Sequence, residues 1–393
     1  MRTSGVIARG ILTPIFKEGD DLVGLVCDSV CGAAQGDGFA LADGDIIGIT
    51  EAVVGRTQGN YATCAQIAED LRAQFGSKSL GIVFPILSRN RFSVLLKAMA
   101  ASTERLIVQL SYPCDEVGNE LISRDLADEK GVNPYTDHFT EAEFRATFGH
   151  ETVHPFTGID YITFYRTLAP NIELVFANDP RHILRYTQNV LVCDIHTRKR
   201  TQRIVQAAAP EAKVLRMDDI LTHSVAGSGY SEYGLLGSNK ATEEKVKLFP
   251  RDTQAVVDAV QAEMRKRTGA RVEVMVYGDG GFKDPRGGIW ELADPVVSPA
   301  YTAGLAGTPN EIKIKYVADN EFAHLSGEAL TDALRERIAQ KDSSLVGKMQ
   351  AEGTTPRQIP DLVGSLCDLV SGSGDRGTPV VLVQNYFKNY ASK

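Results

Sequence analysis

The chain has 393 residues, of which 43% are hydrophobic and 23% charged; this composition is typical of a folded globular protein, and the length suffices for two domains. No apolar run approaches the roughly 20 residues of a membrane-spanning helix, and no continuous apolar block marks a secretory signal, so no membrane association and a cytoplasmic location are expected. The formal net charge of -8 argues against nucleic-acid binding, because basic surfaces hold phosphate backbones.

Residues 43–60 carry the first clear strand signal. The sequence DGDIIGITEAVVGRTQGN begins with an Asp-Gly turn signal, continues with apolar and β-branched residues, and ends in polar ones. This order predicts a turn, a strand and then a polar loop.

Residues 79–221 alternate between strand-like and helix-like segments. Short apolar runs are typical of buried strands, and RFSVLLKAMAAS at residues 91–102 predicts a helix between two of them. The segments predicted to contain strands are 79–87, 104–112, 171–178, 183–196 and 212–221. Such alternation predicts a layered α/β region.

Residues 150–154 read His-Glu-x-x-His, the pattern with which a zinc peptidase holds its metal. The pattern works only on a helix, and here Gly149 precedes it and Pro155 follows it. The sequence instead predicts a helix in residues 139–149, with Thr140 as cap and Gly149 as terminator, followed by a loop. A metallopeptidase is therefore only an alternative interpretation.

A predicted amphipathic helix in residues 253–269 leads into a strand in residues 271–279. The strand runs into a stretch rich in glycine and acids, which contains Asp279 and Asp284. Acids at the carboxyl end of a buried strand suit a hard cation such as Mg²⁺, which takes oxygen ligands. The alternative is that these aspartates cap turns.

The end of the sequence predicts a helix in residues 327–340, then a second helix, a glycine-serine loop and a terminal strand. The loop, SGSGDRGTP at residues 371–379, includes Gly372 and Gly374. Backbone N–H groups without side-chain obstruction can bind an anion, although such loops are usually flexible connections.

A second polar segment, residues 228–244, contains Asn239 and Lys240 before a predicted helix start. Lys240 is a candidate to neutralise phosphate charge. The alternative is a helix cap with a solvated lysine.

Several of these stretches together resemble the coenzyme F(420)-0:L-glutamate ligase family, which adds γ-linked glutamate to a deazaflavin coenzyme. The matching segments, in chain order, are LTPIFKEGDDLVGLV, DGDIIGITEAVVGRTQG, GLLGSN, RVEVMVYGD and PDLVGSLCDLVSGSGDRGTPVVLVQ. The resemblance implies an α+β fold: a mixed-sheet core from residues 1–60 and 230–393, with residues 61–229 as an inserted layered α/β domain.

The resemblance also implies roles for individual residues. Asp279 corresponds to a family metal ligand, and Asn239 to an asparagine that contacts the nucleotide. The nucleotide-binding loop corresponds to Thr13, Pro14, Ile15 and Phe16. Arg56 stands where the family has lysine, and it joins Lys240 and Asp279 as a catalytic candidate.

One position departs from the family pattern. The family's other metal aspartate aligns with Leu236, which cannot bind a cation. Either another acid takes its place, with Glu232 or Asp160 as candidates and Asp284 within reach of Asp279, or the metal site is remodelled.

The function implied is a ligase that uses GTP or ATP, with Mg²⁺ or Mn²⁺, to join glutamate or another amino acid to a small-molecule carboxylate. The acceptor is first phosphorylated to an acyl phosphate, which the amine then attacks. A homodimer is also implied. The alternative is a non-catalytic nucleotide- or metabolite-binding protein that retains the fold.

Overall fold

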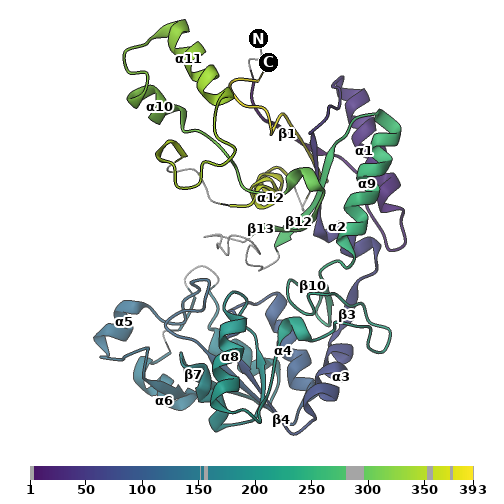
Figure 1. Ribbon diagram of the computed structural model, residues 1–393. Helices are drawn as coiled ribbons and strands as arrows, with labels where there is room; N and C mark the ends of the chain where they lie inside the picture. The colour runs from purple at the N-terminus through teal and green to yellow at the C-terminus, as the bar shows by residue number, and fades with distance from the viewer. Residues whose placement is uncertain are drawn as a thin grey trace. The chain divides into compact units, whose positions relative to one another are not determined.

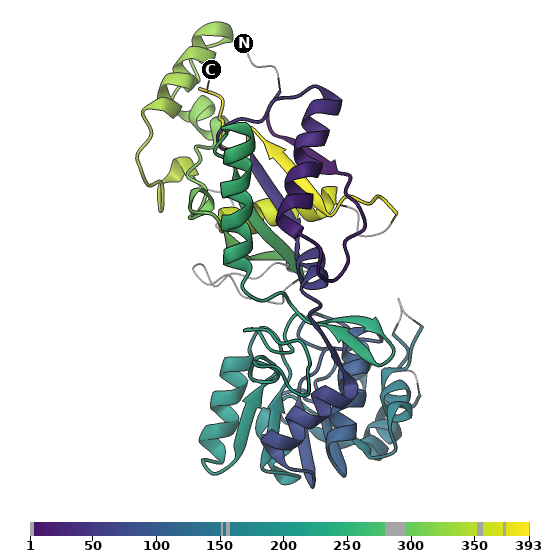
Figure 2. The ribbon, with the colours of Figure 1, turned by 90° about the vertical axis from the view of Figure 1, so that its right-hand side faces the viewer.

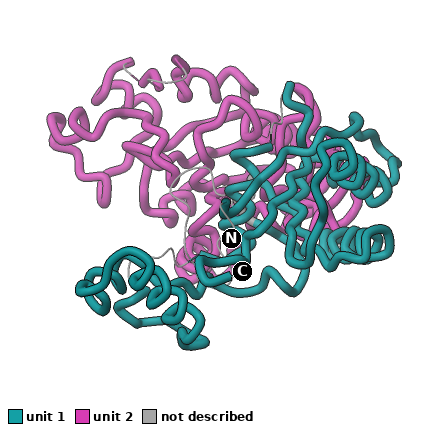
Figure 3. Tube along the Cα trace, turned by 90° about the horizontal axis from the view of Figure 1, so that it is seen from above, with its two compact units in different colours: residues 1–57, 252–393 teal, residues 58–251 magenta. Residues whose placement is uncertain are grey.

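The structure is a computed structural model that describes residues 4–150, 152–154, 158–279, 296–351, 357–371 and 375–392. The chain divides into two compact units, shown in different colours in Figure 3. Unit 1 consists of residues 1–57 and 252–393, and unit 2 of residues 58–251. The segment 230–251, which was expected in the core, thus lies in unit 2.

Unit 1 is built on a mixed sheet with the strand order β1-β14-β2-β12-β13. Its strands are β1 (Ile7–Ile11), β2 (Ile46–Thr50), β12 (Glu273–Asp279), β13 (Val296–Tyr301) and β14 (Val380–Gln384). The β2 and β12 strands are parallel, and the other neighbours are antiparallel. The sequence analysis predicted β2, β12 and β14 but neither β1 nor β13.

Helices cover both faces of this sheet. The α1 (Leu22–Asp37) and α9 (Thr253–Thr268) helices lie side by side on one face, as Figure 2 shows, and α12 (Ile359–Val370) covers the other. Successive side chains of a strand point to opposite faces of the sheet, so alternate residues of β2 pack against different helices. Ile47 packs with α1 and α9, and Ile46 packs with α12. The predicted helix end at Gly269 is confirmed, since that residue adopts a φ of 77°.

The remaining helical elements of unit 1 are α2 (Glu51–Thr57), η3 (Ala303–Leu305), α10 (Ile314–Asn320), α11 (Gly327–Ala339) and η4 (Met349–Ala351). The α2 helix corrects the prediction of a polar loop after β2. Its buried side chains, Val53 and Val54, join the core beneath α1, and this burial outweighs the weak helix propensity of β-branched residues.

Unit 2 contains a second sheet with the order β6-β7-β5-β4-β8-β9. The strands are β4 (Ser79–Val83), β5 (Arg105–Leu110), β6 (His138–Thr140), β7 (Ile172–Ala177), β8 (Asn189–Val192) and β9 (Lys213–Arg216). All neighbours are parallel except β6, which is antiparallel to β7. The predicted layered α/β region is confirmed.

Helices pack on both faces of this sheet as well (Figure 1). One face carries α3 (Cys64–Phe75), α4 (Arg91–Ser102) and α7 (Tyr161–Leu168), and the other carries η1 (Pro180–Arg185) and α8 (Arg198–Ala208). Shorter elements are α5 (Arg124–Glu129), α6 (Glu141–Phe148) and η2 (Met217–Asp219). The α6 helix has the predicted cap, Thr140, and the predicted terminator, Gly149.

A small sheet, in the order β10-β11-β3, completes unit 2. Its strands are β3 (Tyr61–Thr63), β10 (Asn239–Thr242) and β11 (Lys245–Lys247). The β10–β11 hairpin corrects the prediction of a helix after Asn239.

The two ends of unit 2 are hydrogen-bonded to each other. The Gln58 side-chain amide donates to the Arg251 carbonyl at 2.7 Å, and the Arg251 backbone N–H donates to Gln58 Oε1 at 3.1 Å. The chain therefore enters and leaves unit 2 at one place. Among the helices that the structure describes, none has the length and apolar character needed to cross a membrane.

Candidate functional site

The strand directions of unit 1 bring several loops to one edge of its sheet, here called the carboxyl edge. The β2 and β12 strands run in parallel, and β1 runs the same way because both β1 and β2 are antiparallel to β14. The residues that follow β1, β2 and β12, and those that precede β14, therefore share this edge. Loops at such an edge are held by a rigid sheet and commonly carry ligand sites.

Asp279 is the last residue of β12, and its backbone is paired with Val296 of β13. The predicted position of this acid at the end of a central strand is confirmed at the level of the backbone. Its side chain, and the whole of Asp284, lie outside the described residues, as do Gly372 and Gly374.

A second acid, which the sequence analysis did not select, lies next to the end of β12. Glu51 begins α2 directly after β2, and its residue is only 4% exposed. A side chain added at Gly278 would place its Cβ 2.2 Å from Glu51 Cγ, so glycine at that position leaves room for Glu51 one residue before Asp279. The available signal was an acid placed immediately after a buried strand.

The predicted nucleotide loop also lies at the carboxyl edge. The Thr13 backbone N–H donates to the Gly377 carbonyl at 3.3 Å, which joins the loop after β1 to the loop before β14. Ile15 is 80% exposed and Pro14 is exposed, whereas Phe16 is buried in the core with α1. Phe16 therefore anchors the loop, and its neighbours are accessible to a ligand.

Arg56 lies in the last turn of α2 and is exposed. It lies five positions after Glu51 in the sequence, which corresponds to about 7.5 Å along the helix axis. The helix therefore carries a buried acid at the end nearest the carboxyl edge and a solvated cation near its other end.

The remaining predicted site residues belong to unit 2, where the structure gives them partners or positions of their own. Lys240 forms an ion pair with Glu243, and hydrogen bonding to Lys240 lowers the pKa of Glu243. Asn239 pairs with Lys247 in the β10–β11 hairpin. Glu232 is exposed, and Leu236 is buried in the hydrophobic interior.

Asp160 is a structural residue in unit 2. Its carboxylate caps α7 by accepting from the Ile162 and Thr163 N–H groups, and it forms a 2.8 Å ion pair with Arg145. Burial raises its pKa, but the hydrogen bonds from Thr163 and Arg145 outweigh that effect, so the pKa is lowered. These contacts account for an acid at this position without a metal.

The His-Glu-x-x-His segment does not form the helix of a metallopeptidase. Gly149 ends α6 with a φ of 72°, and the His154 N–H donates to the Ile159 carbonyl at 2.9 Å. Glu151 lies outside the described residues. Within the part of the chain that the structure describes, no cluster of His, Cys, Asp or Glu is arranged to hold a metal ion.

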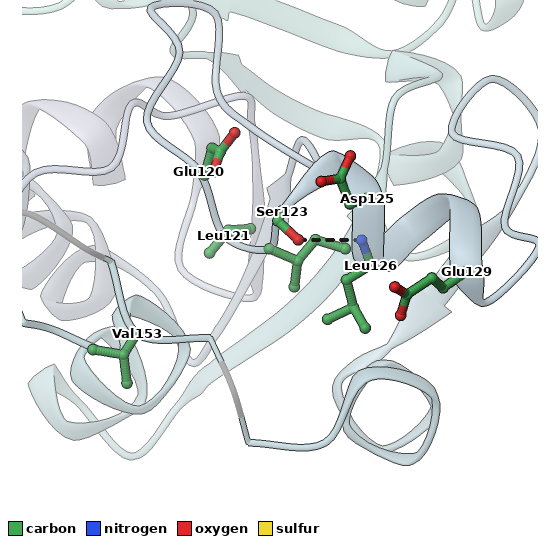
Figure 4. A pocket seen from close by; sticks show the side chains of 8 residues that line it. Glu120, Leu121, Ser123, Asp125, Leu126, Glu129 and Val153 are labelled. Atoms are coloured by element: carbon green, nitrogen blue, oxygen red, sulfur yellow. Dashed lines mark hydrogen bonds between the residues drawn. The ribbon is translucent and has the colours of Figure 1, made fainter.

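A cavity of about 400 Å³ lies beside α5 in unit 2 (Figure 4). Carboxylates of Glu120, Asp125 and Glu129 line it, and the Ser123 hydroxyl accepts from the Leu126 N–H at 3.1 Å to cap the helix. The cavity contains none of the predicted site residues, and its acidic lining does not suit a nucleotide.

Two carboxylates, Glu116 and Asp194, lie in the segments that follow β5 and β8 in unit 2, and Asp194 is buried. Glu116 accepts from the backbone N–H groups of Ile195 at 2.5 Å and His196 at 3.1 Å. Asp194 accepts from the Thr197 hydroxyl at 2.6 Å. Burial raises the pKa of Glu116 to about 7, with a further contribution from the negative charge of Asp194.

Glu116 should make the stability of unit 2 depend on pH. Folding raises the pKa of this carboxyl from 4.5 to about 7, so its protonated form stabilises the folded state. This contribution to the free energy of unfolding is fully present below pH 4.5, is lost as the pH rises through 7, and amounts to at most about 3 kcal/mol. Thermal unfolding should show a smaller loss of stability between pH 5 and pH 8 for Glu116→Gln than for the wild type. Equal pH profiles for the two proteins would contradict this assignment.

Comparison with protein families gives one match. Residues 10–385 match the family model described as F420-0:Gamma-glutamyl ligase, which covers nearly the whole chain and both units. The comparison with individual curated proteins gives no match.

Proposed function

The chain belongs to the F420-0:gamma-glutamyl ligase family, and from this premise we propose that it is a ligase in which a nucleoside triphosphate drives amide formation at the carboxyl edge of unit 1. The observation that carries the proposal is the close approach of the Glu51 side chain to Gly278, the residue that precedes Asp279 at the end of β12. Two acids at the ends of adjacent parallel strands supply oxygen ligands of the kind that Mg²⁺ or Mn²⁺ takes when it binds phosphates.

In this proposal, Glu51 takes the role for which the sequence analysis considered Glu232 and Asp160. Asp160 is already satisfied by Arg145 and the α7 backbone. Glu51 and Asp279 both belong to unit 1 and flank Gly278. The metal, when bound by these acids, offsets the negative charge of the nucleotide phosphates.

The nucleotide is proposed to bind the loop that follows β1. Thr13, Pro14 and Ile15 lie at the same edge as Glu51, and the Thr13–Gly377 hydrogen bond fixes the loop. Exposed Ile15 offers an apolar surface to a base, and exposed Arg56 adds positive charge to the α2 surface. Lys240, which is paired with Glu243, has no role in this proposal.

The proposed reaction has two steps. A carboxylate oxygen of the acceptor attacks the terminal phosphorus of GTP or ATP, forming an acyl phosphate and releasing the nucleoside diphosphate. The amine of glutamate, or of another amino acid, then attacks the acyl carbon, loses a proton to solvent or a base, and displaces inorganic phosphate. The protein contributes by positioning the reactants and by offsetting charge on the phosphoryl oxygens. Homodimer formation stays a prediction.

Thermal unfolding in the presence of nucleotide and metal tests the proposed site. GTP or ATP with Mn²⁺ should raise the unfolding temperature, since a ligand at 100 times its dissociation constant stabilises the fold by about 2.7 kcal/mol. Glu51→Gln should lose the part of this shift that depends on Mn²⁺, because it removes the negative charge and leaves the side-chain volume almost unchanged.

Glu328→Gln is the matched control, because Glu328 is an exposed acid of α11 in the same unit. It should show the full shift. The proposal fails if neither nucleotide shifts the wild type with either metal. Binding without amide formation for any acceptor would favour the non-catalytic alternative.

A further inference from the structure

A second cavity in unit 2, of about 410 Å³, brings two arginines and two histidines together between hydrogen-bonded loops. It lies where β7 ends and β6 begins, and the residues that line it are Tyr135, Thr136, Asp137, His138, Ala177, Asp179, Arg181, His182 and Arg185. Cavities of this size accommodate small molecules. Nothing in the proposed ligase reaction uses it.

Two imidazole rings and a guanidinium group meet in this cavity. The ring centroids of His138 and His182 are 4.4 Å apart, and Arg185 Nη1 donates to His138 Nε2 at 2.9 Å. A guanidinium group only donates hydrogen bonds, so His138 Nε2 is unprotonated in this arrangement. His182 is 7% exposed, and its contact with the Tyr186 hydroxyl is long, at 3.5 Å.

The acids of the cavity have other partners. Asp179 forms a 2.6 Å ion pair with Arg181, and Asp137 accepts from the Asn133 N–H at 2.9 Å and from the Thr136 hydroxyl at 3.0 Å. Among the ion pairs of the described residues, none joins a carboxylate to Arg185. Arg185 therefore contacts an imidazole and no carboxylate, so its guanidinium group is available to a ligand anion, while the two arginines and two aspartates of the lining balance in formal charge.

The electrostatic state of His182 agrees with this geometry. Burial, together with the neighbouring His138 and Arg185, lowers its pKa to about 4. The ring is therefore neutral near pH 7, and an anion beside it would favour its protonated form.

The walls of the cavity are held by a buried amide network. The Asn178 side chain donates to the Tyr112 carbonyl and, at 2.9 Å, to the Pro134 carbonyl, which joins the loops before β6 and after β7. Gln109 of β5 donates to the carbonyls of Ala177 and Asp179. These contacts fix the backbone on both sides, so the donors are preorganised for a ligand.

An aromatic side chain stands at the mouth of the cavity. Tyr135 is 90% exposed, although an aromatic ring usually buries most of its surface. Its backbone is fixed by a 3.0 Å hydrogen bond from its N–H to Asn133 Oδ1. A planar group attached to an anion in the cavity can therefore lie against this ring.

We propose that this cavity binds the phosphate group of a small phosphate monoester whose planar portion lies against Tyr135. Arg185 contributes the planar fork of donors that suits phosphate oxygens, and the adjacent His138 and His182 contribute ring N–H groups. The site lies wholly in unit 2, so it is separate from the acids proposed to bind metal and nucleotide in unit 1.

Calorimetric titration of the full chain with phenyl phosphate tests the proposal, because this probe has the ring and the monoester but no nucleoside. Phenyl phosphate should bind more tightly than inorganic phosphate, and Arg185→Ala should weaken binding at least about 10-fold, the loss expected for a charge-assisted pair. Tyr135→Ala should weaken the binding of phenyl phosphate but leave the affinity for inorganic phosphate unchanged.

Arg203→Ala is the matched control, since Arg203 is an exposed arginine of α8 in the same unit. It should bind phenyl phosphate as the wild type does. Glu51→Gln should do so as well, which distinguishes this site from the ligase site. Unchanged binding in Arg185→Ala would overturn the proposal, as would equal affinity for benzoate, which carries a carboxylate on the same ring.

Discussion

Asp279→Asn should abolish amide formation while leaving the fold intact. Asparagine has nearly the shape of aspartate, and the backbone of Asp279 pairs with β13 whichever side chain is present. Partners that merely orient a metal ligand contribute about 10–100-fold to metal affinity or activity, so loss of a proposed ligand itself should cost at least roughly 100-fold. The measurement is release of inorganic phosphate with GTP or ATP, Mn²⁺, glutamate and an acceptor carboxylate.

The control for this prediction is Asp319→Asn, which removes the same charge from an exposed position in α10. It should turn over at the wild-type rate. Full activity in Asp279→Asn would show that Asp279 does not bind the metal. If the variant instead loses both its activity and its cooperative unfolding transition, Asp279 has a structural role.

Gly234→Ala should destabilise unit 2 strongly. Gly234 has a φ of 55°, and an added Cβ would lie 2.5 Å from the Ile220 carbonyl oxygen and 2.7 Å from that of Met217. Both are backbone atoms, so neither can move aside cheaply. Left-handed strain and overpacking together should cost about 3 kcal/mol or more, which thermal unfolding followed by circular dichroism can measure.

Gly131→Ala separates the two contributions. Gly131 also belongs to unit 2 and has a φ of 66°, but an added Cβ there would meet nothing within 4 Å. The Gly131→Ala variant should lose only about 1 kcal/mol of its free energy of unfolding, because of backbone strain alone. If the two variants are equally stable, the close approach of the Met217–Ile220 backbone is not what requires glycine at position 234.

The same glycine shows how far the sequence could predict the site. The GLLGSN segment supported the family resemblance, and the family is confirmed over residues 10–385. The segment itself, however, packs against the η2 turn and leads into a hairpin, so its glycine has a structural reason. A local motif does not reveal which distant backbone approaches it.

Sequence patterns predicted the fold well where an element is buried or clearly capped. The short apolar runs that predict buried strands held for β4, β5 and β7, and the capping residues of α6 were predicted individually. The α2 helix was missed because its polar residues and Gly55 resemble a loop, while its stability comes from packing of Val53 and Val54 in the core.

Glu51 was missed for a related reason. Its proximity to Asp279 depends on the parallel pairing of β2 with β12, whose residues are more than 200 positions apart in the chain. Nothing local to either strand encodes that pairing. The acid could be recognised only as one of many that follow an apolar run.

The position of β14 also constrains the order in which the protein can assemble during synthesis. This strand, near the end of the chain, lies between β1 and β2, near its start. On the ribosome, β1 and β2 must therefore wait until residues 380–384 have been made before they acquire their shared neighbour. Residues 58–251 supply every strand of their own sheets and can fold as soon as they emerge, so nascent β1 and β2 remain unpaired with β14 for the time needed to translate the later segments.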